Sequence, residues 1–132
     1  MISLAGHHSR IAAARYNFAV ALGRARNFDA AQRQLEAALE SDPGLADAHE
    51  LLANLLMARN QAAAALPHYR AWARLRPESA QAQFGLGSAL AVTGDRAAAS
   101  PFLQKAAVGG DPGTRDAAAR LLRELGVVPQ KE

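Results

Sequence analysis

Four histidines are the side chains of this sequence that most readily suggest chemistry. His7 and His8 are adjacent near the N-terminus, and His49 and His68 lie in the middle of the chain. A histidine pair could transfer protons or bind a metal ion. A metal site, however, needs further ligands at fixed geometry, and none clusters near either pair in a chain that has no cysteine. We therefore predict no metal site and no cofactor.

The remaining candidates for catalysis are equally isolated. The carboxylates are scattered, and no Ser/His/Asp set is suggested by the helix faces inferred below. Gly85-Leu86-Gly87 lies inside a predicted helix, whereas a phosphate-binding loop joins a strand to a helix. The glycines between Gly109 and Gly113 are typical of a turn. We predict that the protein is not an enzyme.

The composition favours a single all-α domain. Of 132 residues, 50% are hydrophobic but only 5% aromatic, and alanine, the best helix former, supplies much of the apolar share. No apolar run reaches the roughly 18 residues of a membrane span, and no signal peptide opens the chain. The net charge of +3 has no clustered basic run, which argues against nucleic-acid binding. We expect a bacterial, cytoplasmic protein.

An internal repeat with a period of 34 residues organises the chain. Each repeated position keeps one physical type: small, large apolar, small, large apolar, then proline. The residues that coincide are Ala19, Ala53 and Gly87; Leu22, Leu56 and Leu90; Ala31, Ala65 and Ala99; Leu35, Tyr69 and Leu103; and Pro43 and Pro77. Such regularity indicates one structural unit used three times.

Apolar spacing within each unit predicts two helices joined by a turn. Asn60 and Gly94 suit a left-handed residue after the first helix, and Asp29 and Asp95 suit the start of the second. We predict helices over 10–24, 28–41, 46–59, 62–75, 80–92, 96–108 and 114–125, preceded by a mobile leader that holds His7 and His8.

A 34-residue unit of this kind resembles the tetratricopeptide repeat. Tyr16-Asn17-Phe18-Ala19, Asn27-Phe28-Asp29-Ala30-Ala31 and Leu39-Glu40-Ser41-Asp42-Pro43 read like the core phrases of that family. The resemblance implies a right-handed superhelical stack of antiparallel helical hairpins, an α-solenoid of about seven helices. We expect a leader at 1–11, repeats at 12–45, 46–79 and 80–113, a capping helix at 114–126 and a C-terminal tail at 127–132.

The resemblance also predicts how the helices pack. Ala31, Ala65 and Ala99 should face the small residues of the preceding helix, so that two backbones approach closely. Trp72 departs from the pattern, because the equivalent positions hold alanine. We expect Gly85 and Gly87 to open a shelf for its indole ring, the alternative being a partly exposed aromatic.

In this family the first helices of the repeats line a concave groove that holds partner proteins. The positions that match this lining are Tyr16, Asn17, Val20, Arg24, Asp47, Glu50, Asn54, Met57, Gln81, Phe84, Ser88, Asp116, Arg120 and Arg123. The basic and amide clamp with which some members hold the C-terminus of a heat-shock chaperone is absent, since Val20, Glu50 and Gly85 occupy clamp positions. Asp47 and Glu50 favour a basic ligand segment, while Tyr16 and Phe84 could equally be packing residues.

The sequence therefore predicts a protein–protein interaction module, an adaptor or scaffold that binds a peptide or protein segment in its groove. A second hypothesis is that the chain is the recognition or dimerisation segment of a larger enzyme, such as a transferase or hydroxylase. A third is a homodimer formed through the outer face of the first helix, where Ile11, Ala14 and Phe18 have no preceding repeat to cover them.

Overall fold

A computed structural model describes residues 3–127 of the chain, which form seven helices and no strand. The helices are α1 (Leu4–Arg24), α2 (Phe28–Ser41), α3 (Ala46–Ala58), α4 (Ala62–Leu75), α5 (Ala80–Val92), α6 (Arg96–Gly109) and α7 (Pro112–Glu124). The predicted all-α class and the number of helices are confirmed. Five of the seven helices begin at the predicted residue.

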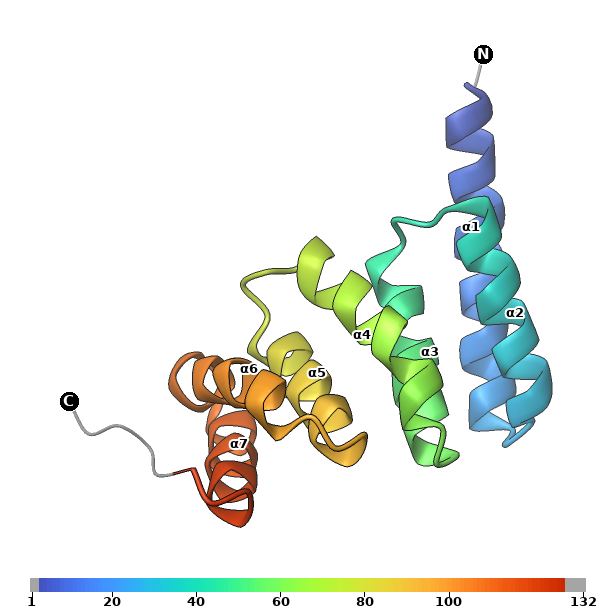
Figure 1. Ribbon diagram of the computed structural model, residues 1–132. Helices are drawn as coiled ribbons and strands as arrows, with labels where there is room; N and C mark the ends of the chain where they lie inside the picture. The colour runs from blue at the N-terminus through green and yellow to red at the C-terminus, as the bar shows by residue number, and fades with distance from the viewer. Residues whose placement is uncertain (1–2, 128–132) are drawn as a thin grey trace.

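Consecutive helices pack as antiparallel hairpins, α1 with α2, α3 with α4, and α5 with α6 (Figure 1). The hairpins follow one another in chain order, and α7 packs against α6 and α5 at the end of the stack. Each hairpin lies mainly against its neighbours in the sequence, as in a solenoid. The chain therefore has the predicted stacked-hairpin architecture.

The turn inside each hairpin repeats the same backbone conformation. Arg26, Asn60 and Gly94 have φ values of 63°, 62° and 95°, and they are separated by the 34-residue period of the sequence. In each turn the next residue donates its backbone N–H to the carbonyl of a leucine near the end of the preceding helix, at 2.8–2.9 Å. These bonds satisfy carbonyls that a helix end leaves without a partner. The 34-residue period of the sequence thus corresponds to a turn conformation that recurs at the same spacing.

The small residues of the repeat are buried where the two helices of a hairpin meet. Ala19, Ala53, Ala31, Ala65 and Ala99 are all at most 2% exposed. In the third repeat, a Cβ atom added to the equivalent Gly87 would lie 3.3 Å from the Ala99 carbonyl oxygen. The close backbone approach expected from the sequence is therefore present.

The first helix is longer than predicted. It begins at Leu4, and the Ser3 hydroxyl caps it by accepting a hydrogen bond from the Gly6 N–H at 3.1 Å. The prediction of a mobile, non-helical leader holding His7 and His8 is wrong, because a serine cap followed by good helix formers starts a helix at this point. The predicted tail beyond Val127 lies outside the described residues.

The last helix also starts earlier than expected, at Pro112. Asp111 accepts a hydrogen bond from the Thr114 N–H at 2.9 Å and another from the Thr114 hydroxyl at 2.9 Å. Proline is well suited to the first helical position, since that N–H has no partner within the helix. These hydrogen bonds to Thr114 hold the pKa of Asp111 below its ordinary value, as expected for an ionised capping carboxylate.

Trp72 is buried, with 6% of its surface exposed, but Gly85 and Gly87 make room for other side chains. The atoms nearest to a Cβ added at Gly85 belong to the Tyr69 ring, at 2.5 Å and 2.7 Å, and those nearest Gly87 belong to Leu103, at 2.7 Å. The Trp72 ring instead lies 6.2 Å from the Tyr69 ring. The prediction of a buried indole is confirmed, and the expectation that both glycines accommodate it is corrected.

None of the helices between residues 3 and 127 is long and apolar enough to cross a bilayer.

Candidate binding groove

Two hollows of similar size lie between the hairpins of the stack. One, of about 410 Å³, lies between the first hairpin and α3. The other, of about 420 Å³, lies between the second hairpin and α5, with one residue from α7. We call them the first and the second hollow. Their residues come mainly from the odd-numbered helices, which the resemblance expects to line the groove.

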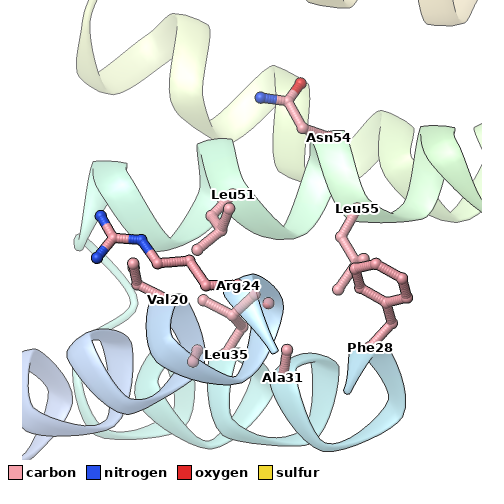
Figure 2. Close-up of a pocket in the computed structure, with 10 residues that line it drawn as sticks. Val20, Arg24, Phe28, Ala31, Leu35, Leu51, Asn54 and Leu55 are labelled. Atoms are coloured by element: carbon pink, nitrogen blue, oxygen red, sulfur yellow. The ribbon is translucent and has the colours of Figure 1, made fainter. Parts of the chain in front are cut away.

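The first hollow is almost entirely apolar (Figure 2). Leu51 and Leu55 point from α3 toward the first hairpin, and Phe28 faces Leu55 from the start of α2. The residues that line it are Ala19, Val20, Gly23, Arg24, Phe28, Ala31, Leu35, Leu51, Asn54 and Leu55. An apolar hollow open to water favours an apolar side chain from a ligand, because its burial removes further surface from water.

The second hollow is more polar and holds more of the predicted groove residues than the first. Its lining is Glu50, Asn54, Met57, Tyr69, Trp72, Gln81, Phe84, Gly85, Ser88 and Thr114. Six of these ten were predicted from the sequence. The Ser88 hydroxyl is buried and has no hydrogen-bond partner among the described residues. This wall therefore combines apolar surface with an unused donor and acceptor.

Asn54 lines both hollows. Its Oδ1 accepts a hydrogen bond from the Tyr69 hydroxyl at 2.7 Å, which fixes the orientation of the amide and leaves the Nδ2 hydrogens to donate. In Figure 2 the amide lies on the side of α3 opposite Leu51 and Leu55. A carbonyl oxygen of an extended ligand would meet a preoriented donor at this point.

Acidic side chains give the centre of the groove a negative charge. Burial raises the pKa of Glu50, and the charge of Asp47 raises it further. Burial raises the pKa of Tyr16, with Asp47 and Glu50 contributing, and burial with Glu50 raises the pKa of Tyr69 to about 12. These two tyrosines consequently remain neutral phenols near two carboxylates. A cation placed there would meet favourable charge at a partly buried site.

The other predicted groove residues line neither hollow. Asp47 and Asn17 are exposed on α3 and α1, Tyr16 is half-buried, and Arg120 and Arg123 are exposed on α7. Their role in binding remains a prediction. Leu51, Leu55 and Thr114, with Phe28 and Tyr69, were not predicted as lining residues. The apolar spacing of Leu51 and Leu55 along their helix was a usable signal, whereas Thr114 depends on how α7 closes the stack.

His49 of α3 and His68 of α4 lie close together. Their Nδ1 atoms are 3.1 Å apart, and His49 Nε2 lies 2.8 Å from the Pro43 carbonyl oxygen. Because that carbonyl can only accept, His49 carries its proton on Nε2, and the His68 Nδ1–H donates to His49 Nδ1. Burial lowers the pKa of His68, and His49 lowers it further, while the charge of Glu36 acts to raise it. The pair ties the loop before α3 to α4, and no third metal-ligating side chain joins it among residues 3–127.

Comparison with known proteins agrees with the stacked-hairpin fold. The family model described as tetratricopeptide repeat matches residues 16–80 and 51–117. No curated protein sequence matches the chain. Solved structures resemble it at low sequence identity, so they speak for the fold alone.

Three such structures are similar over most of their length. The N-terminal domain of stress-induced protein-1 (STI-1) from C. elegans has 17% identity and a TM-score of 0.72, covering 90% of this chain and 97% of its own. The type III secretion translocator chaperone SycD of Yersinia enterocolitica has 18% identity and a TM-score of 0.67, covering 89% of each chain. The Sgt2 tetratricopeptide domain of Aspergillus fumigatus has 17% identity and a TM-score of 0.71, covering 92% and 87%.

Proposed function

This chain belongs to the tetratricopeptide repeat family, whose model matches most of its length, and on that premise we propose that it is a protein-binding module that holds an extended segment of another protein in the groove formed by the two hollows. Proteins of this fold include one described as a chaperone of a secretion translocator. The observation that carries the proposal is that Asn54 of α3 contributes to the lining of both hollows.

The chemistry of the groove specifies the segment. An apolar side chain would occupy the first hollow, against Leu51 and Leu55. A backbone carbonyl would accept from the Asn54 amide, and a basic side chain would lie near Glu50 and Asp47. Apolar burial supplies most of the affinity in such a site, while the acids contribute steering and specificity. The ligand class is therefore a basic segment with at least one large apolar residue.

A pull-down from the native lysate, read by mass spectrometry, tests this proposal. The native chain is compared with a bait that carries Asn54→Ala and Phe84→Ala, two residues that line the second hollow. A matched control carries Val92→Ser and Val108→Ser, because these valines are 68% and 79% exposed and line neither hollow. Circular dichroism checks that all three baits fold.

We expect a protein that the native and control baits capture and the folded groove variant loses. A groove hot spot typically costs tenfold or more in affinity when truncated to alanine, roughly 1.4 kcal/mol or above. Equal capture by all three baits would show that the groove is not the binding surface.

A further inference from the structure

The outward side of α1 carries a second surface, distinct from the groove. Leu4, Ile11 and Phe18 are spaced by seven residues, and a second seven-residue series, offset by three, interleaves with them. The six residues, which we call the α1 outer face, are Leu4, His7, Ile11, Ala14, Phe18 and Ala21. Positions three and four apart lie on one side of a helix, so these residues form a single seam.

The α1 outer face is exposed. Leu4 is 71% exposed and Phe18 53% exposed, although large apolar side chains are normally covered. His7, Ala14 and Ala21 are exposed as well, and only Ile11 is half-buried. The side of α1 that packs on the rest of the molecule carries Ala12 and Ala19 instead, at 0% and 1% exposure. The outer face is thus not used by the fold described above.

The seam has the form of one half of a coiled coil. Large residues at every seventh position alternate with smaller ones, and small residues let a second helix approach closely. α1 has 21 residues against 14 in α2, so its first turns stand clear of the second helix (Figure 1). A helix of this length presents three heptads over about 30 Å. The seam is therefore accessible to a partner helix along its length.

The charges beside the seam are of one sign. Arg10 and Arg24 lie on one flank and Arg15 lies on the other, at the positions that set partner choice in coiled coils. The chain has no aspartate or glutamate before Asp29. Within residues 3–127 the one ion pair joins Arg59 to Asp29, so Arg10 and Arg15 are not neutralised by it. A partner that covers the α1 outer face would therefore need acidic side chains beside Arg10 and Arg15.

We propose that the α1 outer face docks an acidic amphipathic helix of a partner protein, with apolar residues on the seam and glutamates or aspartates at the flanks. A second copy of this chain is disfavoured, because it would bring Arg10 and Arg15 of both copies together without any acid. A lipid surface is disfavoured as well, because it offers no side chains that could pack into the alternation of large and small residues along the seam.

Two synthetic peptides of three heptads test the proposal. Both carry leucine and alanine on the seam, and they differ only in having glutamate or lysine at all flanking positions. Fluorescence anisotropy measures their binding to the native chain at low and at raised salt. We expect the glutamate peptide to bind at least about tenfold more tightly than the lysine peptide, with the difference shrinking in salt.

Variants separate the seam from the flanks. Phe18→Ser should weaken binding of the glutamate peptide about tenfold or more, whereas Val108→Ser, at a still more exposed apolar site on α6, should leave it unchanged. The double variant Arg10→Glu, Arg15→Glu should reverse the preference toward the lysine peptide. Arg10, Arg15, Phe18 and Val108 are all exposed, and circular dichroism verifies folding.

Several results would overturn the proposal. These are equal or absent binding of both peptides, no effect of Phe18→Ser, and failure of the arginine variant to change the preference. Sedimentation that reveals a dimer abolished by Phe18→Ser would assign the face to a second copy. Binding to vesicles of phosphatidylglycerol that needs Phe18, without binding of either peptide, would assign it to a membrane surface.

Discussion

Replacing Ala65 with leucine is expected to lower the free energy of unfolding by about 1–3 kcal/mol. Ala65 is fully buried in α4, in the same core cluster as Ala53 of α3. In the third repeat the equivalent backbones lie so close that a single added carbon meets a carbonyl oxygen at 3.3 Å. A leucine carries three more carbon atoms than alanine, so the hairpin would have to open.

The neighbouring Ala64 provides the matched control, because it lies in the same helix and is exposed. Ala64→Leu has the same change in helix propensity and should alter stability by no more than about 0.5 kcal/mol. Urea unfolding followed by circular dichroism measures both variants. If Ala65→Leu were as stable as Ala64→Leu, the assignment of the 34-residue register to the hairpin contact would be wrong.

Gly85→Ala is expected to destabilise the protein although alanine is the better helix former by about 1 kcal/mol. The new Cβ atom would lie 2.5 Å from one carbon of the Tyr69 ring. That ring cannot easily move, because it is buried, its hydroxyl donates a hydrogen bond to Asn54, and it packs beside the Trp72 ring. Overpacking of this kind typically costs about 1–3 kcal/mol, which exceeds the gain in propensity.

Gly23→Ala is the control for this substitution. Gly23 also lies in a helix, but no atom of a neighbouring side chain or segment comes within 4 Å of its added Cβ. That variant should be more stable than the native chain, by up to about 1 kcal/mol. Thermal and urea unfolding compare the two variants. A stabilised Gly85→Ala variant would show that Tyr69 does not depend on the glycine.

The repeat architecture could be predicted from the sequence because its determinants are local and recur. The size of the side chain at positions such as Ala31 and Ala65, and the left-handed residue at Asn60 and Gly94, each restrict the backbone within one hairpin. Arg26 was harder to predict, since a residue with a side chain rarely adopts positive φ. Its position 34 residues before Asn60 was the available signal.

The errors concern features that depend on distant contacts or on weak signals. The start of α1 depends on a single serine cap at Ser3, and apolar periodicity carries no signal of such a cap. The assignment of Gly85 to Trp72 failed because the direction of a side chain across two helices depends on both helix rotations. Tyr69, three residues before Trp72, packs against Gly85 instead.

The groove was predicted only in part for the same reason. Residues on one helix face, such as Glu50, Asn54 and Met57, follow directly from helical spacing, and they do share a hollow. The apolar first hollow depends on how far α3 stands from the first hairpin, and no local pattern fixes that separation. Its lining by Phe28 and Leu35 of the second helix could be recognised only once the hairpins were placed.

Site-specific photo-cross-linking tests the central claim, that the groove holds a segment of a partner protein, most directly. A photoreactive phenylalanine analogue replaces Met57 or Gln81 in the second hollow and, as controls, Val92 or Val108 on exposed surface. The chains are irradiated with the captured partner, and the adduct is mapped by mass spectrometry. We predict adducts to one short, basic segment of the partner from Met57 and Gln81 and none from the two valines; adducts from the valines alone would contradict binding in the groove.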